Sequence, residues 1–385
     1  MKTPFYSIKN FALIAGIMLA FTSCKKDDKE KPSIRTAISY SVLTPTTPYK
    51  STFLDASGQT TVDFTTGNTR YKMFQALDDY AKSATSVQIE ANTLKNMFSN
   101  SGTPFTGDYA SLNGTGIQLR NIIASSKSVG YAEAARLKFD THFAEMAAIS
   151  LANGVTASKG VAGKLENRLV DARGMETAQI IQKSLIGALQ LDYIGNVLLN
   201  TNGLNAENYT VVSGKNYTQL EQNWDQAYAF LTLNPIYLGG STNDLKGTTE
   251  FGLGSYVWED NKANYAKIYP AFLKGRAAIV NNDKAELQVQ ATFIRTQFEL
   301  AIATAAVRYL TEWGTSTTDA SKAHAIGEGA GFIYSLRFCS LNGADAAFSD
   351  GILTALLSPT GGFWDLTQLK VETTKASIKA KFNIQ

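Results

Sequence analysis

The sequence predicts an all-α protein, a helical bundle with an irregular N-terminal segment. Long stretches place apolar residues at helical spacing, as Met73, Phe74, Leu77 and Tyr80 do. Several of these stretches are rich in alanine, and no segment shows the alternation of strands and helices that builds a parallel sheet. The 385 residues are 44% hydrophobic and 18% charged, a composition that is typical of a folded globular chain.

The chain divides into an irregular start and a series of predicted helices. Residues 34–66 are expected to be irregular or weakly extended, because Pro45 and Pro48 interrupt a partly alternating run. Helical spacing begins near Asn68 and recurs to the C-terminal region. The helices are predicted over residues 69–83, 88–99, 131–152, 175–200, 218–232, 262–281, 285–313, 319–342, 345–357 and about 364–381.

Two of these helices carry clear packing signals. Residues 131–152 are rich in alanine and place four large apolar residues on one stripe. The stripe consists of Phe139, Phe143, Met146 and Ile149. Residues 175–200 are apolar on much of their circumference, which predicts a central helix.

Glycine-rich links separate several helices, and residues 239–255 are read as one of them. Within this link, Gly252-Leu253-Gly254 is not read as a helix start and carries no dinucleotide-binding signal. The second half of the chain repeats the pattern of apolar and alanine-rich helices seen in the first half. This pattern predicts two pseudo-repeated bundles, residues 36–205 and 206–385.

The N-terminus has the features of a targeting segment. Lys2 and Lys9 precede an apolar run at 11–21 that is too short to span a bilayer comfortably. Cys24 then follows small residues, as in a bacterial lipobox. We therefore expect residues 1–23 to be a lipoprotein signal peptide and Cys24 to carry the lipid. The alternative is an ordinary signal peptide with an unmodified cysteine.

The next segment, residues 24–35, is expected to be a charged tether. Its run KKDDKEK contains no apolar residue, so it cannot pack against a core. A lipidated cysteine followed by lysine and acids resembles the surface-export signals of Bacteroidota lipoproteins, and a simple hydrophilic spacer is the alternative. We expect a lipoprotein of the outer membrane, facing either the surface or the periplasm.

Removal of residues 1–23 takes away two lysines and no acid, which lowers the formal charge from +3 to +1. This balance argues against nucleic acid as a partner.

Few residues can carry chemistry. The sequence contains no HExxH, GxSxG, P-loop or CxxC motif, and it has only 2 His and 2 Cys. Cys339 lies in an apolar stretch and is expected to belong to the core.

Each histidine has a glutamate at helical spacing. His142 and Glu145 are three residues apart, and His324 and Glu328 are four apart, so each pair shares one helix face. Two such pairs on facing helices could form a four-ligand site for iron, zinc or manganese. The alternative is a buried histidine hydrogen-bonded to its acid. The glycines at 327, 329 and 331 indicate that another helix packs closely there.

Five features together resemble a family of uncharacterised Bacteroidota lipoproteins that carries a domain of unknown function and is imelysin-like. They are the lipobox, the HxxE pair His142–Glu145, NWDQAYAFL at 223–231, FLKGRAAI at 272–279 and AHAIGEGAGFIYSL at 323–336. The resemblance covers about residues 50–380 and implies an all-α fold with two four-helix-bundle halves. It also implies an association with iron uptake or a metallopeptidase. The family's GxHxxE motif is kept at His142 and Glu145, but Asp140 stands where its glycine would be. Within 223–231, Trp224 is expected to be a structural anchor.

Three functions follow as hypotheses. The first is a non-enzymatic, lipid-anchored binding protein for iron or an iron-linked ligand. The second is a metallopeptidase of the imelysin type, which requires a metal and a water-activating base. The third is a structural lipoprotein that docks an unknown envelope partner.

Overall fold

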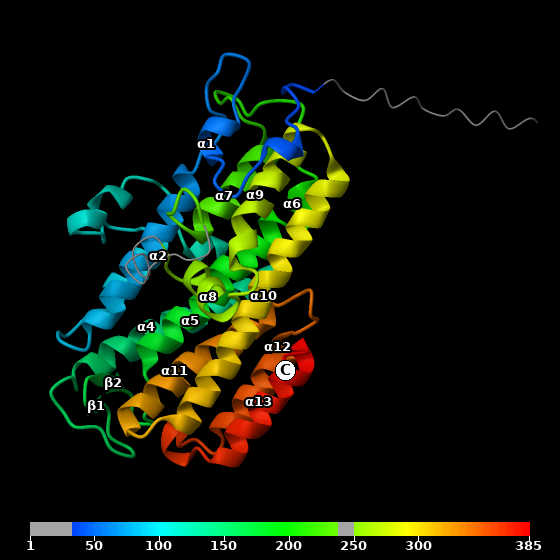
Figure 1. Cartoon of the computed structure of the whole chain (residues 1–385). Helices are drawn as coiled ribbons and strands as arrows, with labels where there is room; N and C mark the ends of the chain where they lie inside the picture. The colour runs from blue at the N-terminus through cyan, green and yellow to red at the C-terminus, as the bar shows by residue number, and fades with distance from the viewer. Residues whose placement is uncertain (1–32, 238–249) are drawn as a thin grey trace, which may run out of the picture. The chain divides into compact units, whose positions relative to one another are not determined.

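The computed structural model describes residues 33–237 and 250–385, and it confirms the all-α prediction (Figure 1). The predicted signal peptide, Cys24 and most of the tether lie outside the described residues. The helices are α1 (Tyr49–Thr52), α2 (Thr65–Ser83), α3 (Ala91–Ser99), α4 (Val129–Ser150), α5 (Thr177–Leu185), α6 (Thr201–Leu204), α7 (Gln219–Leu231), α8 (Leu253–Asp260), α9 (Tyr265–Val280), α10 (Lys284–Thr315), α11 (Asp319–Ser335), α12 (Ala346–Leu357) and α13 (Gln368–Phe382).

Local sequence sets many of the helix starts. The Thr218 hydroxyl accepts a hydrogen bond from the Glu221 N–H, while the Glu221 carboxylate accepts one from the Thr218 N–H. This capping box satisfies two backbone donors at the start of α7. The helices α4, α10 and α11 have ordinary N-caps, in which a side-chain oxygen accepts one backbone N–H of the first turn. The capping residues are Ser128, Asp283 and Thr318.

The long helix α10 is the spine of the fold. It packs along α9, α11, α13 and α8, and α11 in turn lies between α10 and α5 (Figure 1). The helix α5 continues into a π-helix over Ile186–Leu198, and almost all of this continuous segment is buried, as its apolar circumference predicts.

Helices from both sides of residue 205 pack together in one compact unit, Ser33–Gln385. The helix α2 packs on α7, and α5 packs on α11. The proposed boundary falls just after α6, within the turn at Asn205. The internal resemblance between 36–205 and 206–385 stays a prediction.

Two local features differ from the sequence-based expectations. A helix, α8, begins at Leu253, inside the segment that was predicted to be a link. The expectation that no helix starts at Gly252-Leu253-Gly254 is therefore wrong. The side-chain oxygen of Gln190 accepts the Leu253 N–H at 2.8 Å, a tertiary contact that no local pattern reveals. In addition, β1 (Gly163–Leu165) and β2 (Arg168–Val170) pair as an antiparallel hairpin between the helices predicted at 131–152 and 175–200, where no strand was predicted.

The burial pattern agrees with the apolar stripes. All four members of the α4 stripe are buried, and Cys339 is fully buried, as predicted. Among the described residues, no helix is both long and apolar enough to cross a membrane.

Candidate functional site

The first predicted pair lies near the surface of α4. The His142 ring Nδ1 is 2.8 Å from Glu145 Oε2, and the two side chains are 18% and 45% exposed. The hydrogen bond from His142 lowers the pKa of the Glu145 carboxyl. The predicted contact between the two residues is therefore present, but His142 is half-buried at the edge of the helix and not within the core.

The second predicted pair is more buried and has a third member. On α11, His324 Nε2 is 3.4 Å from Glu328 Oε1, while His324 Nδ1 is 2.7 Å from Glu176 Oε2. Glu176 is the residue before α5. The two ring nitrogens of His324 thus face two different carboxylates, which come from two helix regions.

The structure does not assemble the four-ligand metal site. Among residues 33–237 and 250–385, no group of three or more His, Cys, Asp or Glu side chains is arranged to hold a metal ion. The reason is visible at the second pair, where each carboxylate already has a cation beside it. Lys183 Nζ is 3.2 Å from Glu328, and an Arg168 nitrogen is 3.7 Å from Glu176. These residues fit an ion-pair network better than they fit a metal.

The network continues through the interior to α2. Lys183 of α5, only 4% exposed, donates a hydrogen bond to the Gln182 side chain. Gln182 Nε2 in turn donates to Asp78 Oδ2 at 2.7 Å, and Lys82 Nζ donates to the same oxygen at 2.8 Å. A row of charged and polar side chains therefore connects α11, α5 and α2 through the core.

The glycine-rich motif of α11 makes this row possible. A Cβ on Gly331 would lie 2.6 Å from Lys183 Cβ, and a Cβ on Gly327 would lie 3.2 Å from Glu176 Cβ. A separation of 2.6 Å is shorter than real Cβ atoms allow, so only glycine fits at position 331 without a shift of the helices. The predicted close approach of another helix is confirmed at Gly327 and Gly331, where the neighbour is α5. At Gly329 an added Cβ would make only an ordinary contact, 3.6 Å from Tyr309 Cβ of α10.

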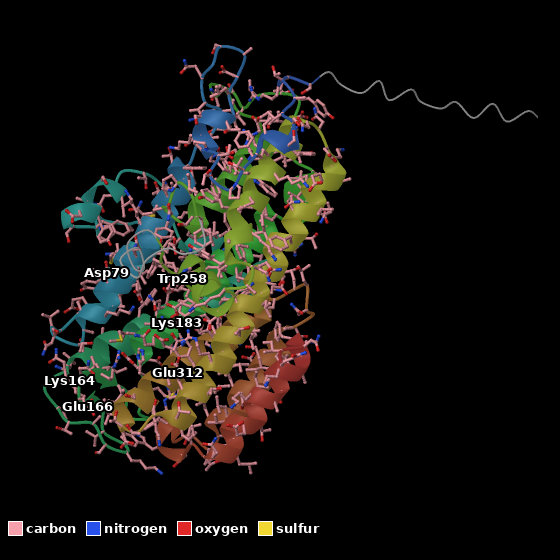
Figure 2. The ribbon with its side chains drawn as sticks, viewed as in Figure 1. Asp79, Lys164, Glu166, Lys183, Trp258 and Glu312 are labelled. Carbon is pink, nitrogen blue, oxygen red and sulfur yellow. The ribbon has the colours of Figure 1, made fainter. Side chains whose placement is uncertain are left out.

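The row ends at a polar cavity of about 260 Å³, which we call the Asp78 pocket. Figure 2 locates two lining residues, Asp79 on α2 and Lys183 on α5. The lining residues are Gln75, Asp78, Asp79, Lys82, Gln182, Lys183, Glu250, Phe251, Gly252, Ser255 and Tyr256. Both signs of charge therefore border one small volume.

Asp78 borders this pocket with one side-chain oxygen that lacks a hydrogen-bond donor within the described parts of the chain. It is 3% exposed, and burial raises the pKa of its carboxyl, although Lys82 and Lys183 oppose that rise. Its Oδ1 atom is buried and has no hydrogen-bond partner among the described residues. Glu328 differs, because the nearby Lys183 and His324 outweigh its burial and lower the pKa of its carboxyl.

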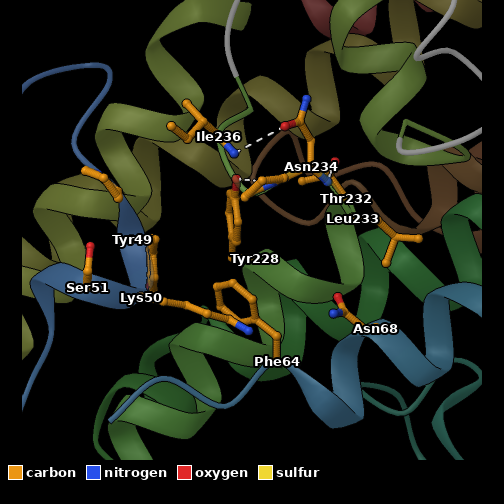
Figure 3. Close-up of a pocket in the computed structure, with 12 residues that line it drawn as sticks. Tyr49, Lys50, Ser51, Phe64, Asn68, Tyr228, Thr232, Leu233, Asn234 and Ile236 are labelled. Atoms are coloured by element: carbon orange, nitrogen blue, oxygen red, sulfur yellow. Dashed lines mark hydrogen bonds between the residues drawn. The ribbon is translucent and has the colours of Figure 1, made fainter. Parts of the chain in front are cut away.

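A second cavity, of about 410 Å³, lies between α1, the start of α2 and the chain after α7 (Figure 3). We call it the tyrosine pocket, after Tyr49 and Tyr228, whose rings stack with centroids 5.3 Å apart. Both hydroxyls are used within the protein. Tyr49 donates to Asp225 Oδ1 at 2.9 Å, and Tyr228 donates to the Asn234 carbonyl at 2.8 Å.

Beneath the tyrosine pocket lies a fully buried ion cluster, which joins two of the sequence motifs. Arg276 of α9 contacts Glu221 at 3.0 Å and Asp225 at 3.1 Å. Trp224 is also fully buried, and its indole N–H donates to the Phe272 carbonyl at 2.9 Å, so the predicted anchoring role is confirmed. These motif residues hold α7 against α9.

Asp78, Lys183 and Glu176 were not among the site residues predicted from the sequence. Asp78 follows Leu77 directly in a helix with an apolar stripe, and Lys183 lies within the apolar stretch 175–200. A charged residue in a helix that is otherwise apolar is a signal of a buried polar contact, because such charges are rarely buried without a partner.

A family model, the domain of unknown function DUF4856, matches residues 48–385. No curated protein and no solved structure matches the chain.

Proposed function

This chain belongs to the DUF4856 family, and from that premise we propose that it is a non-catalytic binding protein of the cell envelope that takes a small zwitterionic ligand in the Asp78 pocket. In this proposal a lipid on Cys24 holds the protein to the outer membrane. The ligand carries an ammonium group and a carboxylate group.

One observation carries the proposed ligand class. A buried carboxylate with an unpaired oxygen, Asp78, lies on the same small pocket as the lysines 82 and 183. An ammonium group of a ligand would give Asp78 the donor that it lacks, and the carboxylate would face the lysines. Charge-assisted hydrogen bonds of this kind are the stronger ones in proteins.

The arrangement supports binding better than it supports catalysis. Lys183 contacts both Glu328 and Gln182, so its ammonium is held in place by the protein. Iron binding and the metallopeptidase lose support, because the residues that the structure describes do not gather three metal ligands. The partner-docking alternative predicts no small-molecule binding in the Asp78 pocket, so a binding experiment separates it from the proposed function.

The test is titration calorimetry of the purified protein with each of the free amino acids. We expect at least one of them to bind, and we expect Asp78→Asn to weaken that binding about 10- to 100-fold, the effect of losing a hydrogen bond to a charged group. Asp192→Asn is the matched control, since Asp192 is also fully buried but accepts its hydrogen bonds from Ser126 and Asn196.

Absence of binding by every amino acid would overturn the proposed ligand class, and so would an Asp78→Asn variant that binds as tightly as the unmodified chain. Metal analysis of protein purified without chelator completes the test. One equivalent of tightly bound iron that is lost in His324→Ala would favour the metal hypothesis instead.

A further inference from the structure

The described chain begins at a fixed point on the fold. Arg35 donates to both carboxylate oxygens of Glu221, at 2.9 and 2.7 Å, and to the Asn216 carbonyl at 2.5 Å. Three residues later, the Ile38 N–H donates to Asn281 Oδ1 at 2.8 Å, and the Asn281 amide donates back to the Ile38 carbonyl. These contacts hold the segment on the start of α7 and on the turn between α9 and α10.

Four exposed apolar side chains lie in the segments at this end of the molecule. They are Ile34, Val42, Leu54 and Val211, which are 38%, 63%, 42% and 42% exposed, and we call them the tether-proximal face. Ile34 and Val211 line the same surface groove.

Hydrogen bonds join the segments that carry these side chains. Asn216 donates to Asp55 Oδ2 and to the Thr60 carbonyl, which links the loop after α6 to the turn after α1. Asn208 donates to the Ile279 carbonyl at the end of α9. Figure 1 shows α1, α6 and the α9–α10 turn at one end, and β1 and β2 at the other.

Two lysines at this end lie beside acidic side chains. Lys274 pairs with Glu286 at 2.9 Å, and Lys215 lies 3.9 Å from Asp63. These two pairs carry no net charge that would attract charged headgroups. Contact with a lipid surface would depend on the apolar side chains and on the anchor.

The length of the tether limits how far Ser33 can lie from a lipid-anchored Cys24. Nine peptide steps separate Cys24 from Ser33. Even a fully extended chain covers only about 30 Å in nine steps. We propose that the tether-proximal face lies against the lipid surface that holds the Cys24 anchor, with its apolar side chains at the headgroup level. This inference rests on the lipidation in the proposed function.

The test places one fluorescent probe at each end of the full-length, lipidated protein. Val211→Cys and Val161→Cys form a matched pair, because these valines are 42% and 45% exposed and Val161 lies just before β1. Each variant is labelled with an environment-sensitive maleimide and reconstituted into phosphatidylcholine vesicles that contain a spin-labelled quencher lipid. The unmodified chain controls for the native thiols, of which Cys339 is fully buried.

We expect several-fold stronger quenching and a blue-shifted emission at position 211, with neither effect at 161. Val42→Cys is the second membrane-side variant and guards against a local defect at 211. Equal quenching at both ends of a protein that floats with the vesicles overturns the membrane-facing surface but leaves the anchor intact. A protein that does not float with the vesicles overturns both the anchor and this inference.

Discussion

Asp225 is a fully buried carboxyl group between Tyr49 and Arg276, and its Oδ2 atom has no hydrogen-bond partner among the described residues. Burial raises the pKa of Asp225 from 3.8 to about 7, although Arg276 opposes that rise. The folded protein therefore keeps a proton on Asp225 over a pH range in which the unfolded chain has already lost it.

We expect the contribution of Asp225 to the free energy of unfolding to fall as the pH rises from about 4 to about 7. In this window the native state binds more protons than the unfolded state, so the slope of stability against pH is negative. Asp225→Asn removes the titrating group and should flatten this part of the profile. Urea unfolding at several pH values, compared between the two proteins, measures the difference. Parallel profiles would show that Asp225 ionises at its ordinary pKa.

Lys183 offers a second prediction at the residue scale. Lys183→Met leaves Glu328, which is only 4% exposed, without its nearest ammonium. Breaking a buried ion pair from one side costs about 3–5 kcal/mol. We expect a loss of that size in denaturant unfolding, and a partial recovery in the double variant Lys183→Met/Glu328→Gln, where the carboxylate charge is also removed. A double variant that is no more stable than Lys183→Met would contradict the charge-based explanation.

Residue spacing was enough to predict contacts within a helix but not the site itself. His142–Glu145 and His324–Glu328 are close because residues three and four apart share a helix face. Glu176, Lys183 and Asp78 join His324 only through packing of helices that are distant in the sequence. The four-ligand arrangement required His142 and His324 to converge with their acids, and spacing along each helix cannot predict such a convergence between helices.

At the scale of elements, the contact between α5 and α11 depends on a glycine. Gly331→Ala would place a methyl group 2.6 Å from Lys183 Cβ and 3.0 Å from the Ile180 carbonyl, so the helices must separate. We expect a loss of about 1–3 kcal/mol, the usual effect of overpacking. Thermal or urea unfolding measures it.

Gly329→Ala is the matched control on the same helix. Its added Cβ would lie 3.6 Å from Tyr309 Cβ, an ordinary contact distance. Alanine is also the better helix former, by about 0.5–1 kcal/mol. We expect this variant to be at least as stable as the unmodified chain. Equal destabilisation by both substitutions would contradict a specific close approach at Gly331.

Periodicity predicted the long helices well and the short elements poorly. The segments predicted at 131–152 and 285–313 correspond to α4 and α10, because an apolar stripe is repeated over many turns in each. The eight-residue α8 was missed because its start depends on Gln190 and on a left-handed Gly252 with φ of +62°. Such tertiary contacts leave no local pattern.

At the scale of the whole molecule, the clearest prediction concerns delivery. Cys24→Ser removes the thiol that a lipid requires, and we expect the protein to move from the membrane fraction to the soluble fraction. Cys339→Ala is the control, because this second cysteine is buried in the core and should leave the membrane association unchanged. Fractionation followed by immunoblotting measures both variants. If the Cys24→Ser protein stays with the membranes, the lipid-anchor hypothesis is wrong.

The Arg35 contacts have a mechanical consequence. A pull on the N-terminal tether would reach the fold first at Ser33, whose hydroxyl donates to the Val280 carbonyl. It would then act on Arg35 and pass to Glu221, which Arg276 also holds. The force is thus shared between the start of α7 and the middle of α9, two helices that Trp224 joins. A protein held in this way would resist drag at its attachment point through its most deeply buried charges.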